Sequence, residues 1–523
     1  MTEEPQIGAH NVAEVEVDER RLLKTMHWWD GFVIGLANPG FLLAGLAGSV
    51  DTLGPKWAAA IWCASALLGA LQAYIYAEPA TMFPDKSGGL SMYAKEGWRK
   101  YFSLAGPIAT FGYWFAWSSV LAIYGGIIGT LMIARFWPGS AADVTHVAFV
   151  DVTWPRAIGA VCILACFVFN VRGMRPAVWF SYATGAMMII PLAALAVIPF
   201  ITGDVTNHAV GGDFISASVK FYGDTPTTFN QIALGIVWFW VIGWSTYGAE
   251  ACTTFAPEYH DPKDDTRWAI VSTGGLLTIL ALLLPISIVG VMGTTAIYND
   301  TTYIAYLTTA LDKTVGDFLG GVFVIFISAG LLLSMNTATM DGSRALYGMA
   351  REGLTVRQLE QLNRFHVPGR AMALDMVLNL CLLFFAPSLL FILVAGNVGY
   401  VLSHVFALSG FLLLRKDRPD WPRPFRLARG WIGVAWMALI INLVCTVFGV
   451  LWMKYTGYLI KGSDVTGYFG PALVTGFAAL AVGVVGYVIG QKQHGRPVRL
   501  TDPSDDAPSP EAYALLAAQS GSG

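Results

Sequence analysis

Charged side chains are scarce in this chain. Of its 523 residues, 55% are hydrophobic and only 13% are Asp, Glu, Lys or Arg, whereas soluble domains carry about 25% charged residues. The few charges fall in short stretches between long apolar runs. This composition argues against a soluble protein, and we expect neither a separate soluble domain nor a nucleic-acid partner.

Cysteine and histidine are also few, with six and eight residues. All six cysteines lie inside apolar runs, so no disulfide between loops is predicted and small apolar packing is the favoured interpretation. The histidines are scattered along the chain, which argues against a membrane-embedded enzyme. No Gly-x-x-x-x-Gly-Lys-Ser/Thr motif occurs, so ATP is not expected to drive the protein directly. We therefore expect no enzyme activity and no cofactor.

Long apolar runs dominate the rest of the sequence. A helix crosses the ~30 Å hydrocarbon layer with about 20 residues, and about 12 runs of this kind can be placed. The ninth and tenth meet at Pro387-Ser388, where either a tight turn or one merged span fits. The predicted spans are residues 31–50, 57–77, 107–134, 157–171, 177–202, 231–256, 268–297, 318–340, 371–387, 388–414, 430–453 and 470–490.

The distribution of Lys and Arg predicts the orientation. Residues 1–27 are polar and show no cleavable signal peptide, and residues 491–523 have the composition of a disordered tail. With the first segment inside the cell, 25 of the 32 Lys and Arg residues fall in cytoplasmic segments and seven outside. The positive-inside rule therefore predicts a multi-pass protein of the cell membrane with both tails in the cytoplasm.

Two spans carry signals of an interruption in mid-membrane. In the first, Pro39 removes a backbone donor and disfavours helical geometry at Asn38, although a simple proline kink would also explain it. The sixth span has two glycines, hydroxyl residues and a carboxylate within residues 243–250. Paired interruptions at corresponding positions in two halves predict a transporter site built from inverted repeats.

Half-helix ends of this kind attract charged groups. Their N-termini attract anions, and their C-terminal carbonyls attract cations. A zwitterion, with its carboxylate and ammonium close together, suits such a site. The interruptions therefore predict an amino acid or a related small amine as the substrate.

Four motifs lie near the ends of the predicted spans. They are Tyr-Ala-Glu-Pro to Ser-Gly-Gly-Leu-Ser-Met-Tyr at 76–93, Tyr-Gly-Ala-Glu to Asp-Pro-Lys at 247–263, Gly-Ser-Arg-Ala-Leu-Tyr-Gly-Met-Ala-Arg-Glu-Gly at 342–353, and Arg-Pro-Asp-Trp-Pro-Arg-Pro-Phe-Arg at 418–426. In this order they resemble the amino acid–polyamine–organocation (APC) superfamily of transporters, of the amino acid permease type. The resemblance covers nearly all of residues 25–430.

The resemblance implies an all-α integral membrane fold. Its core is a five-plus-five inverted repeat (LeuT-like) with helices 1 and 6 interrupted, followed by two extra C-terminal helices. The transporter domain would then span residues 28–490, with a tail on each side at 1–27 and 491–523. Its parts would be repeat 1 at 28–202, repeat 2 at 231–414, and helices 11 and 12 at 430–490.

The resemblance also implies alternating access around a site between helices 1, 3, 6, 8 and 10. Many relatives carry Gly-Ser-Gly-x-Phe in the unwound part of helix 1, and this chain departs from that carboxylate cradle. Asn38 is our predicted ligand contact there. The unwound part falls on Ala37, Asn38, Pro39, Gly40 and Phe41.

Aromatic and hydroxyl residues complete the predicted site. Trp244 falls where relatives carry an aromatic gate. Tyr113 and Trp117 of the third span are predicted to wall the cavity, with plain aromatic packing as the alternative. The unwound part of helix 6 falls on Ser245, Thr246 and Tyr247.

Polar groups inside the spans are functional candidates because they are costly in a membrane. Glu250 is either a protonatable switch or a brace between half-helices, and it is the acidic side chain we expect in the cavity. Asn397, Tyr400 and His404 share one helix face, which either lines the cavity or bonds to other helices. His404 titrates in the neutral range when unperturbed, so it is a second candidate for gating or coupling.

Ion coupling stays open on sequence alone. Ser334 and Thr337 offer oxygens at helical spacing where sodium-coupled relatives hold sodium, but helical hydroxyls also bond to their own backbone. Some proton-coupled relatives place a lysine in helix 5, and residues 177–202 contain none. Proton coupling would therefore need Glu250 or His404.

These observations predict a secondary active transporter in the lipid bilayer. It would move an amino acid or a related small amine by alternating access, as a symporter or an antiporter with a proton or sodium. The alternatives are a polyamine or amino-alcohol carrier, and a nutrient receptor that binds its ligand on the same scaffold without transport.

Overall fold

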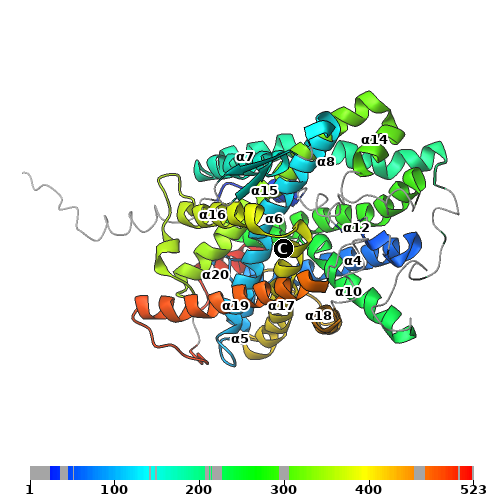
Figure 1. Ribbon diagram of the computed structural model, residues 1–523. Helices are drawn as coiled ribbons and strands as arrows, with labels where there is room; N and C mark the ends of the chain where they lie inside the picture. Colours follow the sequence, from blue (N-terminus) through cyan, green and yellow to red (C-terminus); the bar gives the residue numbers. More distant parts are fainter. Residues whose placement is uncertain are drawn as a thin grey trace, which may run out of the picture.

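Most of the chain can be described in the computed structural model (Figure 1). The described residues are 24–35, 45, 46, 48–50, 52–86, 88–140, 143–147, 150–205, 211, 214, 227–293, 306–452, 466–504 and 507–520.

Helices account for nearly all of the described residues. Nine of them are long and apolar enough to cross a membrane, namely α4, α6, α7, α8, α12, α15, α17, α18 and α19. The helices are α2 (Trp28–Gly35), α4 (Pro55–Met82), α5 (Leu90–Trp98), α6 (Ala105–Phe136), α7 (Trp154–Val171), α8 (Met174–Thr202), α10 (Thr228–Thr246), α11 (Ala251–Thr254), α12 (Asp264–Met292), α14 (Tyr306–Val315), α15 (Asp317–Arg351), α16 (Gly369–Phe385), α17 (Leu389–Asp417), α18 (Trp431–Leu451), α19 (Thr466–Gln493) and α20 (Pro510–Ser520), with 3₁₀ turns η1 (Pro138–Ser140), η2 (Ala256–Glu258) and η3 (Arg357–Glu360).

The three other predicted spans correspond to shorter helices. Only the first part of span 1 forms a described helix, α2, together with a few helical residues at 45–50. Span 6 is divided into α10 and α11. Span 9 is α16, with 17 residues, and a turn separates it from α17, where Ser388 Oγ accepts a hydrogen bond from the backbone N–H of Phe391.

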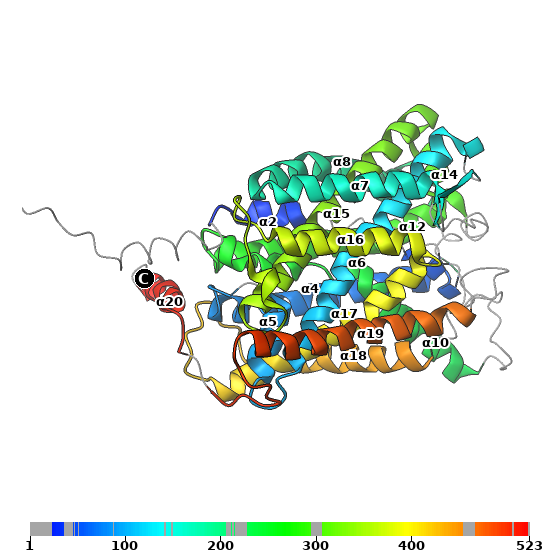
Figure 2. The ribbon, with the colours of Figure 1, turned by 60° about the vertical axis from the view of Figure 1, so that its left-hand side comes forward.

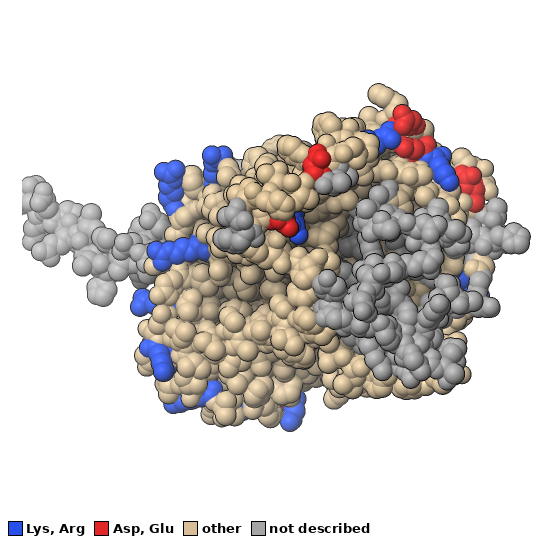
Figure 3. All heavy atoms as spheres, in the orientation of Figure 1, with Lys and Arg blue, Asp and Glu red and all other residues tan. Residues whose placement is uncertain are grey.

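The surface suits a lipid environment. Large apolar side chains such as Val161, Val474 and Val485 are more than half exposed on α7 and α19. The middle of the face in Figure 3 carries little charge, whereas Lys and Arg side chains gather along its left and lower edges. Exposed apolar belts of this kind mark surfaces that water does not cover.

The long helices run side by side between two ends of the molecule (Figure 2). One end carries α5 and the C-terminus and is named the α5 end; the other carries α14. Helix α6 lies in the middle, against α5, α7, α15, α16, α17 and α19. A Cβ added at Gly112 of α6 would lie 2.5 Å from the carbonyl oxygen of Gly399 in α17. Small residues at crossings permit this close backbone approach.

Three features differ from the sequence expectations. The outer loop after α6 forms an antiparallel hairpin of β1 (Val144–Val147) and β2 (Val150–Thr153), so the described chain is not purely helical. Its alternating β-branched residues favour strands. Helix α14 was not predicted, because its ten residues are too few to span a membrane. The tail predicted to be disordered includes α20 and a segment, 496–504, that contacts α5.

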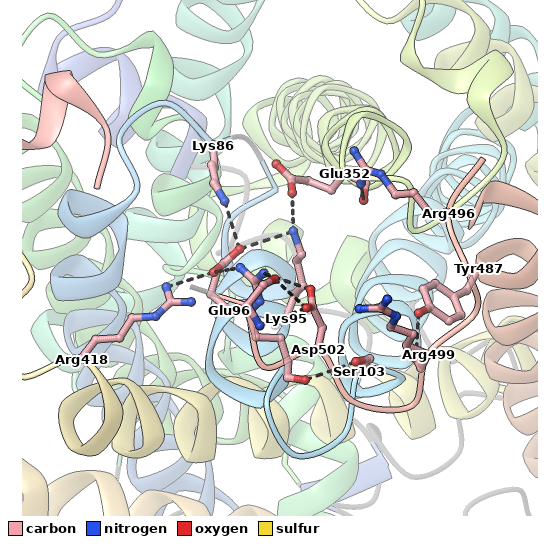
Figure 4. Close-up of polar contacts among 12 residues, drawn as sticks. Lys86, Lys95, Glu96, Ser103, Glu352, Arg418, Tyr487, Arg496, Arg499 and Asp502 are labelled. Atoms are coloured by element: carbon pink, nitrogen blue, oxygen red, sulfur yellow. Dashed lines mark hydrogen bonds and ion pairs between the residues drawn. The ribbon is translucent and has the colours of Figure 1, made fainter. Parts of the chain in front are cut away.

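Ion pairs hold the α5 end together (Figure 4). The centre of the network is Glu96 of α5, whose side chain is fully buried. Burial by itself raises the pKa of Glu96, but the surrounding cations more than offset this and hold that pKa well below its ordinary value. The four cations lie within 3.5 Å of its carboxylate: Lys86, Lys95, Arg99 and Arg418.

Replacing Glu96 with alanine is expected to destabilise the protein by about 3–5 kcal/mol, because it removes the buried carboxylate that four cations share. The pKa of Glu96 in the folded protein lies below its unfolded value of about 4.3. The stabilisation by Glu96 is therefore fully present above about pH 4.3 and is lost as the pH falls toward the folded pKa. Thermal unfolding in detergent measures both effects. Glu360→Ala is the matched control, since its pair with the exposed Arg357 is worth about 0–1 kcal/mol. Equal melting temperatures for the two variants would contradict the prediction.

Candidate substrate site

The sixth span is interrupted in the middle of the bundle. Helix α10 ends at Thr246, the chain is extended at Tyr247, and α11 begins four residues later at Ala251. Gly248 has φ +142°, a value that side-chain-bearing residues rarely adopt. A Cβ on Gly69 of α4 would lie 2.8 Å from the carbonyl oxygen of Thr246. Two glycines therefore permit the break, one within it and one facing it.

Glu250 closes this break with both carboxylate oxygens. Its Oε2 accepts a hydrogen bond from the backbone N–H of Gly248 at 2.6 Å. Its Oε1 accepts one from the Tyr400 hydroxyl of α17 at 2.5 Å. The side chain is 1% exposed, so the brace between the interrupted helix and α17 is fully buried.

Aromatic rings and a histidine surround Glu250. His404 Nε2 lies 4.0 Å from Glu250 Oε1, and His404 Nδ1 lies 3.0 Å from the Tyr76 hydroxyl. The rings of Tyr247 and Tyr400 meet the imidazole edge to face, with centroids 5.1 and 5.0 Å away. Tyr400 and His404 thus lie together beside the break, as their shared helix face predicts.

A small cavity lies next to this cluster. Three predicted site residues from three helices form most of its wall, namely Trp117 of α6, Trp244 of α10 and Tyr400 of α17. Ala116 and Val120 complete the lining. Tyr113 packs against Trp117 and Tyr400, with ring centroids 6.1 Å apart in both pairs. The structure therefore brings together the aromatic part of the predicted site.

Two buried carboxylates were missed by the sequence analysis. Asp341 of α15 is fully buried and faces the hydroxyls of Tyr113 and Thr254, yet neither oxygen makes a hydrogen bond of standard geometry within the described chain. Asp375 of α16 accepts a hydrogen bond from Trp114 Nε1 at 2.5 Å. Asp341 lies one residue beyond the predicted eighth span, and Asp375 lies inside the ninth. An acidic residue in or next to a span was the signal that could have found both.

Other predicted residues serve helix contacts. Asn397 Nδ2 donates to the Trp240 carbonyl at 2.8 Å, which joins α17 to α10. Thr246 Oγ1 lies 2.6 Å from Ser65 Oγ of α4. Ser245 is buried at the end of α10. The position of Asn397 matches the alternative in which the polar face of this helix forms hydrogen bonds to other helices.

The first and eighth spans are in contact through a hydrogen bond. Thr337 Oγ1 of α15 donates to the Ile34 carbonyl of α2 at 3.2 Å, and Ser334 Oγ bonds weakly to its own helix at Gly330. These hydroxyls serve hydrogen bonds here, and sodium binding at Ser334 and Thr337 stays a prediction. The predicted contacts at 37–41, including Asn38, lie outside the described residues.

The fold and the site define a class of protein: a multi-pass helical membrane protein with a buried polar site at an interrupted helix. Comparison with known proteins agrees. A family model described as "Amino acid permease" matches residues 27–480. The chain therefore belongs to the amino acid permease family of the APC superfamily.

Individual relatives are distant. The chain is 22% identical over 390 residues to solute carrier family 7 member 12 of Mus musculus, covering 73% of this chain and 76% of the relative. It is 22% identical to an arginine/ornithine antiporter of Pseudomonas aeruginosa over 61% of each protein. It is 20% identical to a D-serine/D-alanine/glycine transporter of Escherichia coli K12, over 65% of this chain and 71% of the relative. The relatives named as carriers are transporters and not enzymes.

Proposed function

We propose that this protein is a secondary active transporter that moves an amino acid or a related small amine by alternating access. The substrate's ammonium group would bind at the interrupted sixth span, beside the Trp117, Trp244 and Tyr400 cavity. The five-plus-five inverted repeat supplies the two gates in this proposal. The protein would span the cell membrane with both termini in the cytoplasm.

The observation that carries the proposal is the negative character of the site. Helix α10 ends at the break, and the last carbonyls of a helix carry partial negative charge. Glu250 and Asp341 add two buried carboxylates. Arg344, three residues after Asp341 on α15, is already bound by Glu258 at 2.5 and 3.2 Å. A cationic group on the substrate, or a transported proton, would balance these acids.

This charge balance changes one expectation from the sequence. Glu250 was expected to be the acidic side chain of the cavity, which favoured a zwitterion over a polycation. Asp341 adds a second acid at the same site, which favours a substrate whose positive charge is at least one. One relative is named an arginine/ornithine antiporter. A basic amino acid as the substrate of the present protein would agree with that name.

Trp244→Ala tests the proposed site. Removing the indole opens the cavity wall that α10 supplies, and we expect uptake into proteoliposomes to fall at least about tenfold, which corresponds to about 1.4 kcal/mol. Trp436→Ala is the control, because that tryptophan is 53% exposed on α18. Uptake kinetics equal to the parent for Trp244→Ala would remove this residue from the gate.

A further inference from the structure

A second cavity opens at the α5 end. It has a volume of about 440 Å³, which is in the range of small-molecule sites. Its walls come from α5, from the end of α15, from α19 and from the segment 496–504 that follows α19. Figure 4 shows these segments around one space.

The lining is polar and carries an excess of positive charge. Leu354 and Pro497 are its apolar members among the described residues. The basic members are Lys95, Arg99, Arg496 and Arg499, and the acidic members are Glu352 and Asp502. An apolar ligand therefore finds little complementary surface here.

Each acid of the lining is already bound by a base. Lys95 pairs with Glu352, and Arg99 Nη2 lies 3.0 Å from Asp502 Oδ2. The positive charge left over belongs to Arg496 and Arg499.

Neither arginine contacts a carboxylate in the part of the chain that the structure describes. Arg496 Nη1 makes one long bond, 3.4 Å, to the carbonyl of Glu352. The backbone carbonyl of Arg499 accepts a bond from the Tyr487 hydroxyl at 3.0 Å, which fixes the chain and leaves the guanidinium available. In Figure 4 the guanidinium group of Arg496 lies beside Glu352, and that of Arg499 points toward Asp502.

We propose that this cavity binds a phosphate-bearing anion, held by Arg496 and Arg499. The planar guanidinium group matches phosphate oxygens with two parallel hydrogen bonds. A phosphate monoester carries about −1.5 to −2 charges at neutral pH, which matches the two surplus cations better than a single carboxylate would. The volume accommodates a ligand of mononucleotide size. An anionic phospholipid headgroup offers phosphate oxygens from the membrane surface, as a diester with one negative charge.

The ligand would also fasten the tail. Segment 496–504 already contacts the turn that follows α5 through two backbone bonds, from Ser103 N to the Leu500 carbonyl and from Asp502 N to the Arg99 carbonyl, both at 2.7 Å. An anion bound by both arginines would join this segment to α15 and α5. The proposal concerns binding only and does not depend on the identity of the transported substrate.

Thermal unfolding of the full-length protein in detergent tests the site. The probes are AMP and inorganic phosphate, with sodium chloride at matched ionic strength. The variants are the double substitution Arg496→Ala/Arg499→Ala and the conservative Arg496→Lys/Arg499→Lys. The control is Arg364→Ala/Arg370→Ala, which removes the same charge from two exposed positions, one in the loop before α16 and one in its first turn.

For the parent and the control, we expect AMP to raise the melting temperature with the same midpoint concentration. The midpoint is expected at least tenfold higher in the alanine double variant and at an intermediate value in the lysine variant. Nanodiscs of phosphatidylcholine with and without phosphatidylglycerol separate the two sources. Retention of phosphatidylglycerol by the parent but not by the alanine variant, without an AMP effect, assigns the phosphate to a lipid.

Two results would overturn the proposal. One is an effect of AMP that sodium chloride reproduces or that the alanine double variant retains in full. The other is the absence of both an AMP effect and selective retention of phosphatidylglycerol. Should the alanine variant not fold, the lysine variant decides, because a midpoint equal to that of the parent contradicts recognition by the two guanidinium groups.

Discussion

Uptake by Glu250→Gln is expected to fall at least about tenfold relative to the parent. Both oxygens of Glu250 accept hydrogen bonds, one from the backbone of Gly248 and one from Tyr400. A glutamine offers one acceptor and sets its amide N–H against one of these donors. An unsatisfied buried donor costs about 1–3 kcal/mol, so the melting temperature is also expected to drop.

Tyr400→Phe is the matched control for this result. It removes the bond to Oε1 and keeps the bond that closes the break within the sixth span, so its loss of uptake should be smaller. Uptake against external pH then separates two roles of Glu250. A profile of the parent's shape at lower rate identifies a brace, whereas a flattened profile identifies the proton carrier. Parental uptake by Glu250→Gln would contradict both.

Asp341→Asn is expected to raise the apparent KM at least about tenfold while raising the melting temperature. The carboxylate of Asp341 is fully buried and makes no standard hydrogen bond within the described chain. Burying such a charge costs free energy, which an amide of the same shape avoids. In this proposal the buried carboxylate serves to bind a cation. The Asp341→Asn variant should therefore be more stable and bind the substrate more weakly than the parent.

Asp375→Asn separates this effect from a general loss of buried acids. Asp375 is also fully buried, but unlike Asp341 it accepts a hydrogen bond, from Trp114. We expect the KM of Asp375→Asn to stay within about twofold of the parent value. The change expected for Asp341→Asn is at least about tenfold, which corresponds to about 1.4 kcal/mol. Parental KM for Asp341→Asn, or equal KM changes in the two variants, would remove Asp341 from the substrate site.

Local signals were enough to predict most of the spans and the interrupted sixth helix. Apolar runs of about 20 residues report membrane helices directly. The glycines, hydroxyl residues and Glu250 within residues 243–250 indicated the interruption of the sixth span. Trp117, Trp244 and Tyr400 could be placed together because the family resemblance supplies the packing of three helices. Without it, their positions in the sequence carry no information on contact.

Contacts between distant segments explain what the sequence did not reveal. Asp341 was not singled out because it lies one residue past the predicted eighth span, and its burial comes from helices that pack against α15, among them α6 and α11. Asn397 is polar on the face of Tyr400, but its partner carbonyl belongs to Trp240 on another helix. The tail segment 496–504 has a disordered composition, and its order comes from α5 and α19.

Transport itself gives the most direct test of the account. Purified protein is screened by thermal shift against amino acids and amines, and each stabilising compound is offered to proteoliposomes with proton and sodium gradients imposed separately. We expect at least one compound with an ammonium group to stabilise the protein and to accumulate in vesicles of the parent but not of Trp244→Ala. A compound that stabilises the parent and never crosses the membrane under either gradient, or in exchange, would contradict the account and indicate a receptor.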